Sequence, residues 1–187
     1  MKLRLIAATV AATAAVGAAA LPAHAADPAD VTVTGGSLSI TSVTVGNFAG
    51  VTLDGAAKTT TATVDPFSAT DARGTGAGWN VTMQGTQFAE HDGTAYVTGG
   101  KTLPLSSLSL SALAVAANGT TSPAPSTLAP SGIDNTTGAV KIASAAVDTG
   151  MGQYDFTGAN KLSLSIPASA YAKTYRSDLT VSVVSGP

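Results

Sequence analysis

Apolar and polar residues alternate with a period of two along most of the chain after residue 30. This period predicts β-strands that turn one face toward a core. Only a short alanine-rich stretch at 111–117 has a weak helical period. Many short strands separated by turns favour an all-β fold, a single antiparallel β-sandwich of the immunoglobulin-like type. Strands are predicted at 38–41, 43–48, 51–53, 59–64, 79–83, 103–110, 140–142, 153–156, 162–166 and 179–184.

Glycine and proline predict where these strands begin and end. Gly35-Gly36 lies between Val31–Thr34 and Leu38–Thr41, which predicts an opening hairpin. Asp65-Pro66 predicts the end of a strand, because proline has no N–H to donate to a sheet. Residues 118–132 hold three prolines among small and polar residues. They are predicted to form a long loop inserted between strands.

The first residues have the pattern of a signal peptide. Lys2 and Arg4 precede an apolar stretch at 5–21, and Ala23-His24-Ala25 supplies a small–x–small cleavage pattern. Residues 1–25 are therefore the predicted signal peptide, cut between Ala25 and Ala26. The remaining 162 residues (187 − 25) are predicted to form one domain, 26–187. No second apolar stretch is long enough for a membrane span in this mature chain.

Charge and cysteine content narrow the possible partners. Without Lys2 and Arg4, seven basic residues remain against eleven acidic ones, a net charge of −4. No basic cluster occurs, so nucleic acid and anionic membranes are not expected partners. Cysteine is absent, so the stability of an exported form must come from packing and sheet hydrogen bonds.

The inventory of reactive side chains argues against an enzyme. His91 is the sole histidine after the signal peptide and Glu90 the sole glutamate. We interpret His91 as a solvated turn residue rather than part of a catalytic triad. Transition-metal ligands and calcium-loop spacing are missing. The glycine run Gly74–Gly78 leads into a strand rather than a helix, which excludes a phosphate-binding loop. The sequence therefore predicts no catalysis, no metal and no cofactor.

The single tryptophan, Trp79, follows this glycine run and opens an alternating strand. One hypothesis makes its ring an anchor of the core, as is common for a lone tryptophan on a strand. The other makes the ring a platform for a sugar, with Asp71, Arg73 and Asn80 as polar contacts. The sequence leaves both open.

The segment from Asp65-Pro66-Phe67 through Asp71 to Trp79-Asn80-Val81 resembles the first signature of the WxL-domain proteins. These are exported proteins of Gram-positive bacteria that attach non-covalently to peptidoglycan. Residues 150–154, 166–168 and 175–187 resemble the closing region of the family. Two positions depart from its pattern: the first motif has Val81 in place of Leu, and Val181 stands where the second tryptophan is expected. The chain therefore resembles a divergent, actinobacterial-like member.

The resemblance implies a non-catalytic protein that is secreted to the cell surface and binds peptidoglycan or another wall glycan. Asp71, Arg73, Trp79 and Asn80 are then the candidate binding residues. The alternative is a structural or interaction subunit of a surface assembly or extracellular matrix. Such a subunit would bind other surface proteins through edge strands or the 118–132 loop, without contacting glycan itself.

Overall fold

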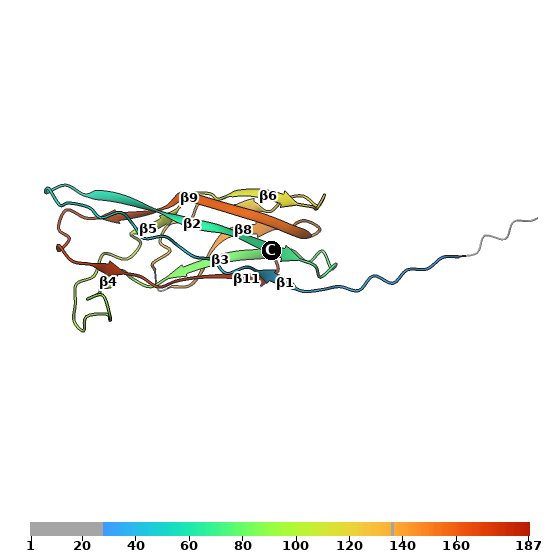
Figure 1. Cartoon of the computed structure of the whole chain (residues 1–187), viewed down its shortest axis with the longest axis horizontal. Coiled ribbons are helices and arrows are strands. Elements are labelled where there is room, and N and C mark those ends of the chain that lie inside the picture. Colours follow the sequence, from blue (N-terminus) through green and yellow to red (C-terminus); the bar gives the residue numbers. More distant parts are fainter. Residues whose placement is uncertain (1–27, 136) are drawn as a thin grey trace, which may run out of the picture. The chain divides into compact units, whose positions relative to one another are not determined.

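The computed structural model describes residues 28–135 and 137–187. The predicted signal peptide and the cleavage site between Ala25 and Ala26 lie outside the described residues. The chain divides into a unit that ends at Val33 and a compact unit, Thr34–Pro187. Every regular element of the described residues is a strand (Figure 1). A search of the same residues finds no helix that could span a membrane.

The first sheet is built around two long antiparallel strands, β2 and β9. Its order is β1-β2-β9-β5, and β6 also pairs with β9. The pairing of β2 with β9 runs from Lys58↔Ile166 to Asp71↔Gly152. The strands of this sheet are β1 (Leu38–Ile40), β2 (Lys58–Asp71), β5 (Leu108–Leu110), β6 (Ala114–Asn118) and β9 (Gly152–Ile166).

The second sheet has the order β11-β3-β8-β7 and is also antiparallel. Two further short strands, β4 and β10, pair at one end of the domain (Figure 1). These elements are β3 (Trp79–Gly85), β4 (Ala89–Glu90), β7 (Ser126–Thr127), β8 (Val140–Ala145), β10 (Tyr175–Arg176) and β11 (Leu179–Ser185).

The two main sheets share one apolar core, which the period-two alternation of their strands supplies. Phe67 of β2 and Phe156 of β9 stack with ring centroids 4.9 Å apart. Trp79 of β3 meets Phe156 edge-on at 6.5 Å, so the second sheet contacts the first through this ring. The all-β, antiparallel prediction is confirmed.

The predicted opening hairpin is wrong. Residues 31–34 form no strand, and β1 pairs instead with the end of β2, Leu38 opposite Asp71. Gly36 N donates to the Ala72 carbonyl at 2.7 Å. A Cβ on Gly35 would lie 2.3 Å from the Arg73 carbonyl oxygen. The two glycines therefore allow a close approach to the end of β2, where the sequence suggested a turn.

Proline does not end β2 as predicted. The strand continues through Asp65-Pro66 to Asp71, and the register with β9 shifts between Val64 and Phe67. In such a bulge the extra residue has no partner, so the missing N–H of Pro66 breaks no pair of the ladder. On the side of β2 away from β9, Asp65 N donates to the Thr44 carbonyl at 3.0 Å.

Other strand boundaries also differ from the prediction. The segment 43–48 contributes one isolated bridge, Val45↔Val64, and 51–53 forms no strand. The segment 103–110 is a strand only at its end, β5, and the alanine-rich stretch at 111–117 contains most of β6 rather than a helix. The 118–132 loop contains the short strand β7.

We predict that Phe156→Ala lowers the free energy of unfolding by about 4 kcal/mol, because it leaves a cavity at the contact of the two sheets. Urea unfolding followed by circular dichroism measures the change. Val147→Ala, at an exposed position, is the control and should shift stability by less than about 0.5 kcal/mol. Equal effects of the two substitutions would contradict the packing described above.

Candidate functional site

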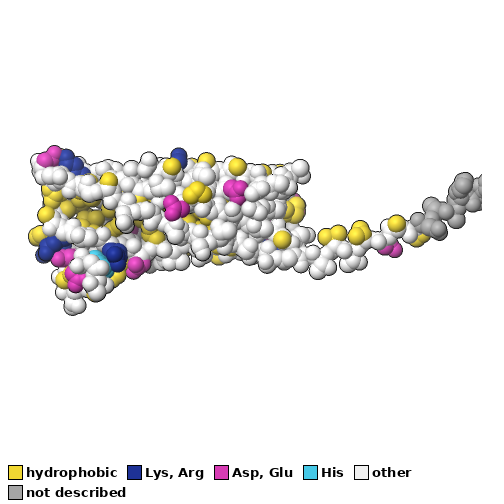
Figure 2. Space-filling model, viewed as in Figure 1, with side chains coloured by type: hydrophobic (Ala, Val, Ile, Leu, Met, Phe, Trp, Pro, Cys, Tyr) yellow, Lys and Arg dark blue, Asp and Glu magenta, His cyan; other side chains and the backbone are white. Residues whose placement is uncertain are grey.

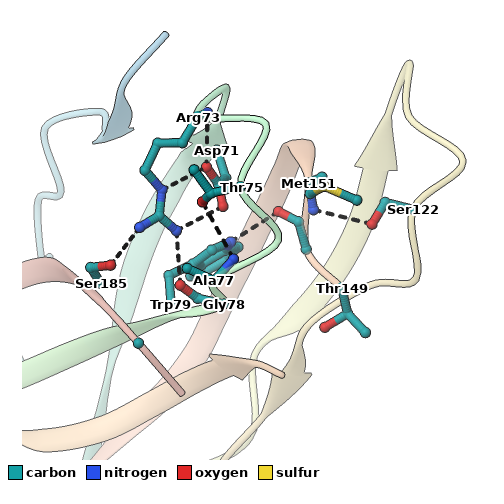
Figure 3. A network of polar contacts seen from close by, with 12 residues as sticks. Asp71, Arg73, Thr75, Ala77, Gly78, Trp79, Ser122, Thr149, Met151 and Ser185 are labelled. Carbon is teal, nitrogen blue, oxygen red and sulfur yellow. Dashed lines mark hydrogen bonds and ion pairs between the residues drawn. The ribbon is translucent and has the colours of Figure 1, made fainter. Parts of the chain in front are cut away.

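Asp71 and Arg73 form a bidentate ion pair at the junction of β2 and the glycine loop (Figure 3). Arg73 Nε lies 2.9 Å from Asp71 Oδ1, and Arg73 Nη2 lies 2.8 Å from Asp71 Oδ2. The same guanidinium donates to the Gly78 carbonyl at 2.8 Å and to the Ser185 hydroxyl. One side chain thus connects the end of β2, the loop, and the end of β11.

Asp71 is buried, whereas Arg73 is partly exposed, with 17% of its side-chain surface accessible. The hydrogen bonds from Arg73 lower the pKa of the Asp71 carboxyl below its ordinary value, more than burial raises it. The same contact raises the pKa of Arg73. Both groups are therefore charged and paired with each other at neutral pH.

Trp79 is fully buried, with 0% of its surface exposed. Its indole Nε1 donates to the Gly150 carbonyl at 2.9 Å (Figure 3), which satisfies the one polar atom of a buried ring. The ring also lies 6.4 Å from that of Tyr154, between centroids. The structure therefore places Trp79 as a core anchor, and the ring offers no exposed face to a sugar.

Asn80 is also buried and points toward the last residues of the chain. Its Nδ2 donates to the Gly186 carbonyl. Its Oδ1 has no hydrogen-bond partner among the described residues. Asn80 thus acts together with Arg73 to hold the end of β11 against the start of β3.

The glycines next to Trp79 are required by close contacts. Gly78 has φ 71°, and a Cβ there would lie 2.6 Å from the Ala145 carbonyl oxygen. Gly150 has φ 69°, and a Cβ there would lie 2.8 Å from Trp79 Nε1. Only glycine fits both the left-handed backbone and the space.

The structure therefore brings together all four residues that the sequence selected, but turns them inward. The hydrogen bonds of Asp71, Arg73 and Trp79 described above, and that of Asn80 Nδ2, all go to the chain itself. This arrangement holds the loop in place.

A second cluster lies at the opposite end of the domain, around β4 and β10. Figure 2 shows charged side chains gathered at this end. Tyr171 is 57% exposed, and Lys101 Nζ lies 4.4 Å from the centroid of its ring. Tyr175 Oη donates to the Tyr171 carbonyl at 3.0 Å. A hollow of about 390 Å³ adjoins these tyrosines and the segment 51–53.

Ion pairs organise the polar part of this cluster. Lys173 Nζ lies 2.8 Å from Glu90 Oε1, and Glu90 Oε2 accepts from Lys101 N at 3.0 Å. The hydrogen bond from Lys173 lowers the pKa of Glu90 below its ordinary value. Tyr171 and Lys173 line the hollow, and Lys101 and Glu90 lie against these two side chains.

His91 is not the solvated residue that the sequence suggested. It is 5% exposed, its Nδ1 accepts from Gly93 N at 3.0 Å, and Arg176 Nη1 lies 3.0 Å from its Nε2. Its ring packs edge-on against Tyr96. The burial follows from the pairing of β4 with β10, which covers the turn.

Sequence reasoning missed the Tyr171 cluster because its members come from three distant segments. Lys101, Glu90 and Tyr171 meet only after β4 and β10 pair. The available signal was the spacing of Tyr171, Lys173 and Tyr175, which puts two rings and a cation within five residues.

The fold defines an all-β domain of antiparallel sheets. A sequence profile described as "WxL domain surface cell wall-binding" matches residues 17–187. The chain therefore belongs to the WxL domain family, and the resemblance seen in the motifs is confirmed. No curated protein and no solved structure gave a significant match.

We predict that Asp71→Asn lowers the free energy of unfolding by about 2 kcal/mol at pH 7, because Arg73 loses a charged partner. The pKa of Asp71 in the native protein lies below its value in the unfolded chain. The contribution of Asp71 to the free energy of unfolding is therefore complete above about pH 4. This contribution is lost as pH falls through the native pKa. The difference between the variant and the native protein should therefore shrink in acid.

Urea unfolding at pH 7 and pH 3 measures this difference. Asp54→Asn is the matched control, since the Asp54–Lys58 pair is exposed and should change stability little at either pH. A difference for Asp71→Asn that is the same at both pH values would contradict the ion pair.

Proposed function

We propose that this protein is exported and attaches non-covalently to the cell wall, with peptidoglycan or an associated glycan as its ligand. Membership of a surface cell wall-binding family supports the location. The signal-peptide pattern of residues 1–25 supports export. Within this proposal the ligand contacts the surface around Tyr171, and the Asp71–Trp79 loop acts by holding the fold.

The observation that carries this choice of surface is the exposure of Tyr171 beside a hollow whose lining is mostly apolar and includes Lys173. A tyrosine ring offers an apolar face to the C–H groups of a sugar, and its hydroxyl offers a hydrogen bond. Lys101, Lys173 and Glu90 add donors and an acceptor for hydroxyl, carboxylate or amide groups of a wall polymer. Trp79 offers none of this, because its ring is buried.

We also propose that the domain is non-catalytic. The described residues contain no group of three or more histidine, cysteine, aspartate or glutamate side chains that could hold a metal ion. The one histidine after the signal peptide is buried against Arg176 and Tyr96.

The immunoglobulin-like sandwich is the arrangement we infer for the two sheets, given their shared core and antiparallel order.

The alternative function is that of an interaction subunit in a surface assembly. The observation that favours it is the position of β11, which ends its sheet and pairs with β3 alone. Assembly and wall attachment use different parts of the domain, so one does not exclude the other.

We predict that Tyr171→Ala weakens binding of the exported protein to purified peptidoglycan by roughly tenfold or more, as expected for an aromatic residue at the centre of a binding surface. A pull-down over a range of peptidoglycan concentrations measures the affinity. Val147→Ala, with a similarly exposed side chain away from this cluster, should bind as the native protein does.

Undiminished binding by Tyr171→Ala would contradict this choice of surface. Absence of binding by the native protein would contradict the wall attachment itself. Unfolding curves of both variants show whether each retains the native fold.

A further inference from the structure

A groove of about 720 Å³, lined by both apolar and polar residues, lies beside β11, at the end of the domain that carries β4 and β10. Leu179 and Val181 of β11 line one side, and the segment 43–48 lines the other. Figure 2 shows apolar atoms in a hollow at this end. The size is that of a specific ligand pocket rather than of a packing defect. Arg176 and Asp178 supply charge among the lining residues.

The strand beside this groove has a free edge. β11 is the terminal strand of its sheet, and β1 contacts it without forming a backbone pair. The outer N–H and C=O groups of β11 therefore have no partner strand among the described residues. An edge of this kind can accept an added strand, and the neighbouring groove can accept its side chains.

The chain carries an unpaired segment with the character of a strand. Residues 31–34 read Val-Thr-Val-Thr, all β-branched, and form no strand with the rest of the described chain. Val31 is 86% and Val33 88% exposed. In an extended conformation both valines face one side and both threonines face the other. This arm would thus present one apolar and one polar face.

The length of the arm favours a second copy as the partner. Gly36 is hydrogen-bonded to Ala72, at the end of the domain where Arg73 holds Ser185. The strand β11 runs from Leu179, at the groove, to Ser185, a span of roughly 20 Å. Val33 lies three residues before Gly36 and Val31 five, reaches of about 10 Å and about 17 Å. Neither valine reaches Leu179, so the two together fall short of the groove of the same copy.

We propose that residues 31–34 of one copy add to the free edge of β11 in the next copy and place Val31 and Val33 in the groove. Asp30, directly before the arm, then approaches Arg176. No carboxylate of the described residues lies within ion-pair distance of Arg176, whereas Asp178 accepts from Tyr96 Oη at 2.8 Å. Because Gly36, which anchors the arm, and the groove lie at opposite ends of the compact unit, the contact is head-to-tail and gives open chains or rings.

The first experiment measures the mass of the predicted mature protein by light scattering over a range of concentrations. The native protein should form assemblies larger than a dimer as concentration rises. Val31→Asp with Val33→Asp should weaken assembly by about tenfold or more, since it places charges against the apolar side chains of Leu179 and Val181 in the groove. Thr32→Asp with Thr34→Asp adds the same charge on the other face and should assemble as the native protein does.

The second experiment mixes two variants that each lack one side of the contact. Val31→Asp with Val33→Asp keeps the groove, and Val181→Lys, whose fold is checked by unfolding, keeps the arm. Each alone should remain monomeric, whereas the mixture should form one-to-one heterodimers. A native protein that is monomeric at all concentrations, assembly unaffected by the valine substitutions, or a mixture that stays monomeric would overturn the proposal.

This inference does not depend on wall attachment. The substitutions for this inference lie in the arm and the groove. A failure to assemble, with full binding to peptidoglycan, therefore contradicts only the arm contact. Loss of peptidoglycan binding in Tyr171→Ala, with assembly retained, bears on the proposed function alone.

Discussion

The structure depends on the burial of one indole ring between two sheets. Trp79 belongs to the second sheet, yet its ring contacts Phe156 and Tyr154 of the first sheet. The one N–H of the ring donates to the Gly150 carbonyl. A ring of this size in a chain with few aromatic residues contributes a large share of the apolar contact between the sheets. Gly150 follows from it, because a Cβ there would lie 2.8 Å from Trp79 Nε1.

The ion pair of Asp71 and Arg73 completes this end of the domain. It connects the end of β2 to Gly78 and to Ser185, so the ends of β2 and of the last strand, β11, are held at one place. Tyr171, which is 57% exposed, and the groove beside β11 lie at the other end. The contacts that hold the loop and the surface proposed for binding thus lie at opposite ends of one fold.

The sequence predicted the strand class well, because period-two alternation is a local property. The strands β3, β8 and β11 were found near their observed positions, and β9 was found in two pieces.

Two kinds of error have a common cause. Gly35-Gly36 and Pro66 were read as local breaks. The structure instead pairs Gly36 with Ala72, and Asp65, the neighbour of Pro66, with Thr44, and these partners are distant in sequence. The Tyr171 cluster was missed for the same reason, since pairing of β4 with β10 assembles it. The candidate residues at the glycine loop were correctly grouped, but alternation alone does not say whether a tryptophan faces a core or a ligand.

The central claim is that Trp79 is a core residue and not a ligand contact. Since the chain has one tryptophan, its fluorescence reports this position alone. We expect the folded protein to emit as a buried indole does, with little quenching by acrylamide, and we expect neither property to change on binding to peptidoglycan. Strong quenching of the free protein that peptidoglycan then suppresses would contradict the account, because it would place the ring at the ligand surface.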